Sequence, residues 1–213
     1  MTQKGYGQFC GFARALELVG DRWAMMIVRD LLVGPKRFSD LHAGLPKIPT
    51  NVLTSRLKQL EAGKVVERRA LPRPPGGVAY ELTVRGRGLE DAVVAIGRWG
   101  AELLDAPRDG EIVTEDSLAM ALRTTFRPEN AGDLHARYEL HVGELVLHAI
   151  VTGPRITVGR GALEKPDLIV ESSPALKDLM SGAMTPRAAL ASGEFRISGP
   201  RKLFDRFAQV FRI

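Results

Sequence analysis

The chain has 213 residues, of which 45% are hydrophobic and 26% are charged, and its net charge is +5. This composition is typical of a globular protein and excludes a disordered or fibrous chain. No apolar run reaches the ~18 residues that cross a bilayer, and the first residues lack the apolar core of a signal peptide, so we expect a cytoplasmic protein that does not enter a membrane.

Helical periodicity dominates the first half of the chain and then gives way to a hairpin pattern. Four segments carry apolar residues at helical spacing and end at a Gly or Pro, namely residues 9–19, 23–32, 38–45 and 49–62. Strands are expected at 65–71 and 78–82, with a hairpin tip at 72–77 between them.

The last helix of this half is expected over residues 84–104. One side of it carries an apolar stripe made of Leu89, Ala92, Val93, Ala95, Ile96, Trp99 and Leu103. This stripe is wider than one small domain needs, which suggests a subunit interface.

A change of pattern at residues 105–111 predicts a domain boundary, because a proline, a glycine and four charges stand there between two periodic segments. We therefore expect one domain over 1–107 and a second over 108–213, each close to ~100 residues. The second alternates between helix and strand patterns, so the fold class is predicted to be α+β. Helices are expected at 118–126, from 173, from 185 and at 200–211, and strands at 133–142, 144–152, 155–159, 167–171 and 194–198.

The order helix, turn, helix, hairpin is that of a winged helix-turn-helix domain, whose fourth helix would enter the major groove of double-stranded DNA. Residues 1–107 hold 16 basic and 11 acidic residues, whereas 108–213 hold 14 of each, which favours a polyanion partner for the first half. Singly, each polar or basic residue is typical of an ordinary solvated surface. Together they predict DNA contacts at Lys36, Arg37, Lys47, Thr50, Asn51, Thr54, Ser55, Arg56, Lys58, Arg68, Arg69 and, at the hairpin tip, Arg73.

The first half resembles the HxlR family of winged-helix regulators, which are relatives of the MarR regulators. The resemblance covers about residues 8–104, through Cys10, 16–23, 27–31, 34–41, 53–57, 60–61, 63–68, 80–83, Gly86, Leu89 and Trp99. It implies a homodimer built from the first and last helices of this half, in which paired recognition helices read a palindromic operator. Pro49 stands where the family often has a small polar residue, which makes Thr50 a weaker candidate for base contact than Thr54 or Ser55.

The second half is similar to a sterol carrier protein type 2 domain. The similarity lies in residues 178–193, in 195–199 and in a final amphipathic helix. It implies a small sheet covered by helices around an apolar tunnel. Candidate ligand-binding residues are Leu147, Ile150, Met180, Met184, Leu203, Phe204, Phe207 and Phe211, and ordinary core packing is the alternative for each of them.

Catalytic and metal-binding patterns are not apparent in the sequence, so we expect no enzyme, no cofactor and no metal site. His135, His141 and His148 fall on one expected hairpin, but a zinc site needs more converging ligands than these positions offer. Cys10 matches a cysteine that some HxlR members use as an oxidant or electrophile sensor, and Arg14, one turn later, would favour its thiolate. The alternative for Cys10 is a small buried hydrophobe near the dimer helix.

These patterns predict a homodimeric DNA-binding transcriptional regulator that is modulated by a small apolar ligand in its second domain. A cytosolic carrier of apolar molecules or lipids, with the winged-helix half used mainly for dimerisation, is one alternative. A thiol enzyme acting through Cys10 is another. The polar, cation-flanked fourth helix argues against the carrier, and the lack of a partner His or Asp argues against the enzyme.

Overall fold

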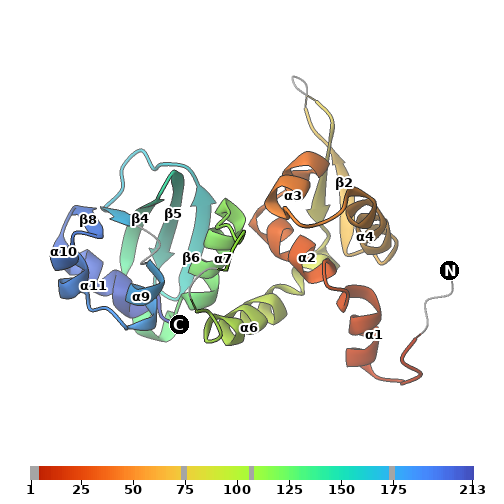
Figure 1. Cartoon of the computed structure of the whole chain (residues 1–213), viewed down its shortest axis with the longest axis horizontal. Coiled ribbons are helices and arrows are strands. Elements are labelled where there is room, and N and C mark those ends of the chain that lie inside the picture. The colour runs from red at the N-terminus through yellow and green to blue at the C-terminus, as the bar shows by residue number, and fades with distance from the viewer. Residues whose placement is uncertain (1–4, 73–75, 106–107, 173–175) are drawn as a thin grey trace. The chain divides into compact units, whose positions relative to one another are not determined.

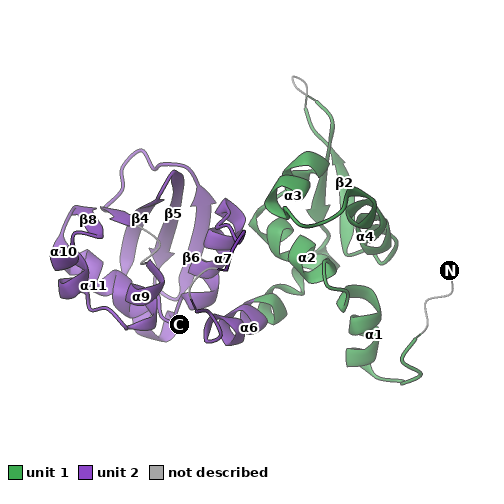
Figure 2. Cartoon of the chain, in the orientation of Figure 1, with its two compact units in different colours: residues 1–93 green, residues 94–213 purple. Residues whose placement is uncertain are grey.

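The computed structural model describes residues 5–72, 76–105, 108–172 and 176–213. The chain has two compact units, residues 1–93 and 94–213, which are coloured separately in Figure 2. The division lies inside one helix, α6 (Glu90–Ala101), rather than in the segment 105–111. The domain limits 1–107 and 108–213 stay a prediction from the sequence, while α6 contributes residues to both units. Of the helices in the described ranges, none is both long and apolar enough to cross a membrane.

The first unit contains the predicted helices and hairpin (Figure 1). Its elements are α1 (Gly11–Val19), α2 (Ala24–Val33), β1 (Lys36–Arg37), α3 (Phe38–Gly44), α4 (Thr50–Ala62), β2 (Val66–Ala70), β3 (Val78–Leu82) and α5 (Val84–Arg87). The hairpin strands are antiparallel, and β1 extends their sheet to the order β1-β3-β2. The sequence did not predict β1, because so short a strand shows no alternation.

The expectation of a single helix over 84–104 is wrong, because the chain forms α5 and α6 with Gly88 and Leu89 between them. Thr83 is the N-cap of α5, and its hydroxyl accepts a hydrogen bond from the Gly86 amide at 3.1 Å. Gly86 has no room for a side chain, since a Cβ there would lie 2.1 Å from the Val65 carbonyl oxygen. The short helix α5 therefore packs tightly against the base of the hairpin before α6 begins.

An aliphatic core orients the helices of the first unit. Leu53, Leu57 and Leu60 of α4 are at most 2% exposed, which confirms the predicted stripe. Other fully buried side chains of this unit are Ile27, Val28 and Leu31 of α2 and Leu41 of α3. Because the leucines occupy one side of α4, the opposite side of that helix faces out of the unit.

The second unit is α+β, as predicted. Its remaining helices are α7 (Glu115–Thr125), α8 (Pro128–Ala131), α9 (Leu176–Ser181), α10 (Pro186–Ser192) and α11 (Arg201–Val210). Its strands are β4 (His135–Val142), β5 (Leu145–Thr152), β6 (Arg155–Arg160), β7 (Leu168–Ser172) and β8 (Phe195–Ser198). They form one sheet in the order β6-β5-β4-β7-β8, in which only the β4–β7 pair is parallel.

The two faces of this sheet have different environments. Tyr138 and Leu140 of β4 are fully buried on the face that meets α11, and their partners across β5, Ala149 and Leu147, are buried with them. Ile150 instead pairs with Arg137, so it lies on the opposite face from Leu147. The expectation that Ile150 lines a shared cavity is therefore corrected: it is three residues from Leu147, and successive side chains of a strand alternate between faces.

Aromatic rings fill the space between the sheet and α11. Phe207 and Phe211 have ring centroids 4.5 Å apart, and Tyr138 stands edge-on to Phe207 at 5.3 Å. Phe126, directly after α7, reaches Phe211 at 5.8 Å, and Phe204 reaches Phe195 of β8 at 5.9 Å. Phe204 and Phe207 of α11, and Phe211 directly after it, thus pack as a core.

Candidate DNA-binding interface

The exposed side of α4 carries the polar residues that the sequence predicted to contact base edges. Asn51, Ser55 and Lys58 are exposed, and Thr54 is partly exposed beside them. The periodicity of 3.6 residues places them opposite the buried leucines. Helix α4 begins after Pro49, an extended N-cap residue with φ −66° and ψ 142°. The structure therefore brings this part of the candidate set together on one accessible surface.

Two threonines of α4 already make hydrogen bonds within the unit. The Thr54 hydroxyl donates to the Thr50 carbonyl oxygen at 2.8 Å. The Thr50 hydroxyl lies 3.4 Å from Nε2 of His42, a residue of α3. Thr50 is thus turned toward the neighbouring helix, which agrees with its lower rank as a base contact.

Two cations of the candidate set are held inside the first unit. Lys36 is only 4% exposed, so burial removes it from the surface and from the candidate set. Arg56 pairs with Asp21, with 2.9 Å between Nε and Oδ1, and it also donates to Gln59. Arg56 therefore ties α4 to the segment before α2, which the sequence could not reveal because the two residues are far apart in the chain.

Arg37 links α3 to the hairpin. It precedes α3 as the N-cap residue, and its amide donates to the Asp40 carboxylate at 2.9 Å. Its guanidinium donates to the Gly76 carbonyl oxygen at 2.7 Å. Gly77, at φ +108°, lies against the same guanidinium, and a Cβ there would be 3.0 Å from Nη1. Arg37 is therefore a positioning residue for the hairpin.

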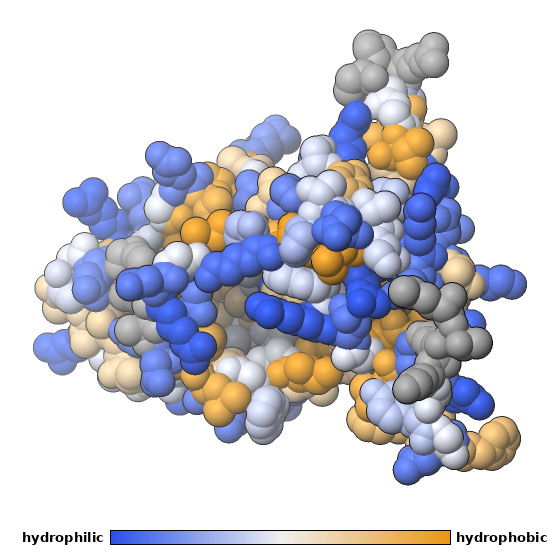
Figure 3. All heavy atoms as spheres, turned by 45° about the vertical axis from the view of Figure 1, so that its right-hand side comes forward, coloured by the Kyte–Doolittle hydropathy of each residue, from blue (hydrophilic) through white to orange (hydrophobic). Residues whose placement is uncertain are grey.

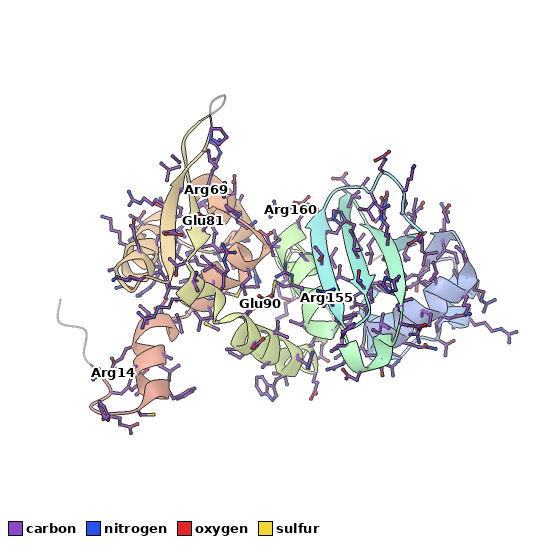
Figure 4. The ribbon with its side chains drawn as sticks, turned by 180° about the vertical axis from the view of Figure 1, so that it is seen from behind. Arg14, Arg69, Glu81, Glu90, Arg155 and Arg160 are labelled. Carbon is purple, nitrogen blue, oxygen red and sulfur yellow. The ribbon has the colours of Figure 1, made fainter. Side chains whose placement is uncertain are left out.

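The hairpin arginines face acidic partners. Arg68 lies 3.2 Å from Glu61 and sits over the ring of Tyr80. Arg69 lies 3.3 Å from Glu81 on the adjacent strand. Both residues are labelled in Figure 4. The arginine side chains are 51% and 57% exposed, respectively, and such exposed pairs contribute little to stability. Both guanidiniums can therefore exchange a carboxylate for a phosphate.

Three predicted cations remain, namely Lys47, Lys58 and Arg73. Lys47, in the turn before α4, and Lys58 are exposed, as phosphate contact requires. Arg73 lies outside the described residues.

Sequence reasoning also passed over exposed Lys64 and Arg85. Both line a shallow hollow together with Glu61 and Glu67, whose carboxylates repel phosphate. The arrangement gives no reason to add these two cations to the interface, and only the fold brings the four charges together.

Cys10 is exposed at the start of α1, so the alternative of a buried small hydrophobe is wrong for the single chain. The backbone amides of Ala13 and Phe12, in the first turn of α1, lower the pKa of its thiol. Arg14 does not supply this effect: its guanidinium pairs with Glu17 at 2.8 Å. The amides at the N-terminus of α1, rather than Arg14, therefore favour the thiolate of Cys10.

The candidate ligand residues of the second unit are unequally buried. Leu147, Met180, Phe204, Phe207 and Phe211 are at most 4% exposed, whereas Met184 and Leu203 are partly exposed. The hydroxyl of Tyr138 donates to the Leu203 carbonyl oxygen at 3.3 Å. Burial raises the pKa of this phenol to about 12, so it stays protonated and keeps that bond at all ordinary pH values.

Comparison with known proteins agrees with both halves of the structure. Residues 18–108 match the HxlR-like helix-turn-helix family, and residues 120–212 match the SCP-2 sterol transfer family. The HTH-type transcriptional regulator YvaP of Bacillus subtilis is 38% identical over 94 residues, which cover 44% of this chain and 87% of that protein. YodB of the same organism is 35% identical over 102 residues, or 48% of this chain and 88% of that protein.

A solved structure, the reduced form of YodB, is 33% identical and covers 47% of this chain and 100% of that chain, with a TM-score of 0.40. The family matches and the sequence relatives define the class of protein: a DNA-binding transcriptional regulator with a winged helix-turn-helix. The chain belongs to the HxlR-like helix-turn-helix family and carries, in addition, a segment of the SCP-2 family.

The lowered pKa of Cys10 leads to a prediction about its reactivity. The folded chain should be alkylated by iodoacetamide with a rate that rises at lower pH than in the urea-unfolded chain, because the amides of α1 favour the thiolate only when the helix is formed. Mass spectrometry of Cys10 across a pH series measures both profiles. Coincident folded and unfolded profiles would show that α1 does not activate this thiol.

Proposed function

We propose that this regulator acts as a homodimer that reads a palindromic operator with helix α4 of each copy. The observation that carries the proposal is the exposed face of Asn51, Ser55 and Lys58, held opposite a buried leucine stripe in a unit of the HxlR-like family. Asparagine, serine and threonine reach base edges, whereas lysine meets phosphate. Arg68 and Arg69 of the hairpin approach the adjacent backbone.

Exposed apolar side chains support the homodimer. Phe9 and Phe12, at the start of α1, are 105% and 73% exposed, and Ile96 and Trp99 of α6 are 58% and 66% exposed. Figure 3 shows apolar side chains at the surface around α1, at the lower right. Large apolar residues that are exposed on a helix are typical of an interface, and a second copy of the chain would cover those of α1 and those of α6.

Lys58→Ala tests the orientation of α4 on DNA. We expect weaker binding to all duplex sequences and a slope of log K against log salt that is smaller by about one, because one phosphate contact is lost. Lys165→Ala, which removes the same charge from an exposed position in the second unit, is the control and should leave the slope unchanged. Electrophoretic shift titrations over a salt series measure both variants.

Two further measurements, of stoichiometry and of sequence preference, test the proposal as a whole. The complex with the DNA upstream of the protein's own gene should contain two chains per duplex, as measured by analytical ultracentrifugation. If no genomic fragment binds better than random DNA at near-physiological salt, the regulator does not read an operator as proposed.

We further propose that the second unit binds a small apolar ligand and that α6 carries this state toward the DNA-binding unit. Arg98 of α6 donates to the carbonyl oxygens of Thr124 and Phe126, at 3.1 and 3.3 Å. Gly97 lies so close to Thr124 that a Cβ would be 2.7 Å from its Cγ2. Phe126 in turn contacts Phe211 of the aromatic core. A ligand that separates the rings of Phe126 and Phe211 would therefore disturb the contacts that hold α6 against the end of α7.

Arg98→Ala tests this coupling. For the natural chain we expect a long-chain fatty acid to change operator affinity by about 5–150-fold, the usual range of allosteric coupling. Arg98→Ala should bind a fluorescent fatty-acid probe as before, yet lose most of that change, because α6 is no longer tied to the end of α7. Arg196→Ala, at an exposed position of β8, is the matched control.

The possible outcomes separate the alternatives. A chain that binds no apolar molecule, and whose operator affinity is indifferent to such molecules, has a second unit that serves only stability or dimerisation. A chain that binds the probe but no DNA is instead a carrier of apolar molecules that uses the winged-helix half for dimerisation.

We also propose that Cys10 adjusts DNA binding. Its exposure beside Phe9 and Phe12 places a reactive thiol among the side chains that would form the dimer contact. Peroxide and diamide should change operator affinity in the natural chain and not in Cys10→Ser, as measured by fluorescence anisotropy. Equal responses of both proteins would leave Cys10 without a sensing role.

A further inference from the structure

The hydroxyl group of Thr54, on the exposed side of α4, already makes a hydrogen bond inside the helix. Its oxygen lies 2.8 Å from the carbonyl oxygen of Thr50, one turn earlier. A carbonyl oxygen has no proton, so Thr54 must be the donor and Thr50 the acceptor. The only proton that Thr54 has to offer a base is therefore used inside the helix.

This bond also fixes the direction of the Thr54 methyl group. Threonine in a helix divides between two rotamers because its hydroxyl can bond the preceding turn, and the bond to Thr50 selects one of them. The methyl group then has one orientation before any ligand arrives. Its contact with a partner would cost little side-chain entropy.

Thr54 stands between two residues suited to DNA. Asn51, Thr54 and Lys58 follow one another at i, i+3 and i+7, so they form one row along the helix. Asn51 and Lys58 are exposed, and Thr54 is partly exposed. An asparagine amide is suited to bidentate bonds with adenine, and a lysine reaches phosphate. Thr54 lies between these two residues in the row.

The major-groove edges of the bases present mostly acceptors: N7 and O6 of guanine, N7 of adenine and O4 of thymine. A hydroxyl without an available proton cannot bond to any of them. The remaining recognition element that suits a methyl group is the 5-methyl of thymine, which accepts apolar contacts from threonine.

We propose that Thr54 is a specificity-determining residue that reads the 5-methyl group of a thymine, with its own hydroxyl locked onto Thr50. This inference rests on the proposed reading of DNA by α4. The ligand is a DNA duplex whose half-site carries a thymine opposite Thr54. Within that row, Asn51 favours a neighbouring adenine.

The test begins with the full chain and a random-sequence duplex library, from which bound sequences are selected and enriched. Each thymine of the enriched half-site is then replaced in turn by deoxyuridine, which lacks only the 5-methyl group and keeps the same base pairing. Dissociation constants are measured by fluorescence anisotropy at one fixed salt concentration.

We expect one thymine per half-site whose replacement weakens binding by about fourfold, the effect of removing one buried methyl-sized group. Thr54→Ser keeps the hydroxyl and removes the methyl, so it should bind the thymine and deoxyuridine duplexes alike. Thr54→Val keeps a methyl and removes the hydroxyl, so it should retain discrimination. Lys165→Ala, at an exposed position of the second unit, is the control and should discriminate as the natural chain does.

Three results would overturn the inference. The first is equal binding of the thymine and deoxyuridine duplexes by the natural chain at every position, and the second is full discrimination by Thr54→Ser. The third is a loss of affinity in Thr54→Val but not in Thr54→Ser, which would mean that the hydroxyl oxygen accepts a hydrogen bond from the amino group of adenine or cytosine. Thermal unfolding of each variant checks that the fold is kept. A library that yields no enriched sequence would overturn the proposed operator reading itself, which distinguishes the two failures.

Discussion

The orientation of α4 depends on the burial of its leucine stripe, and the assignment of the DNA-facing surface depends on that orientation. Leu53, Leu57 and Leu60 are at most 2% exposed. Loss of one such leucine typically costs about 2–5 kcal/mol, a large share of the stability of a small domain. Any other rotation of the helix would expose leucines and bury Asn51 or Lys58. Burial of the leucines therefore determines which side of α4 is exposed, and the polar residues stand on that side.

Helix α6 meets several demands with 12 residues. It buries Val93 at the end of the first unit, whereas Arg98 binds two carbonyl oxygens at the end of α7 in the second unit. Ile96 and Trp99 are exposed on it. The apolar stripe of α6 is therefore only partly covered by the residues that the structure describes.

Local patterns in the sequence were sufficient for α1 to α4 and for the hairpin strands of the first unit, but not for the break between α5 and α6. They were insufficient wherever a residue's state depends on a partner far along the chain. Lys36 reads as a surface cation but is buried, and the pair between Arg56 and Asp21 leaves no signal in the sequence. Ile150 carries the right chemistry for a tunnel but lies on the other face of the sheet. Periodicity fixes which side of an element is apolar, whereas pairing distances and registers arise only from the fold.

The acidic partners of the hairpin arginines limit what that hairpin contributes to affinity. An arginine that leaves Glu81 or Glu61 for a phosphate also leaves that carboxylate close to the DNA, where like charges repel. Each exchange therefore gives less attraction than a solitary arginine would. Binding to arbitrary DNA is weakened most, because it depends on phosphate contacts alone. In the proposed complex, Asn51 and Thr54 of α4 would meet base edges rather than phosphate, and they would then decide which duplex is bound.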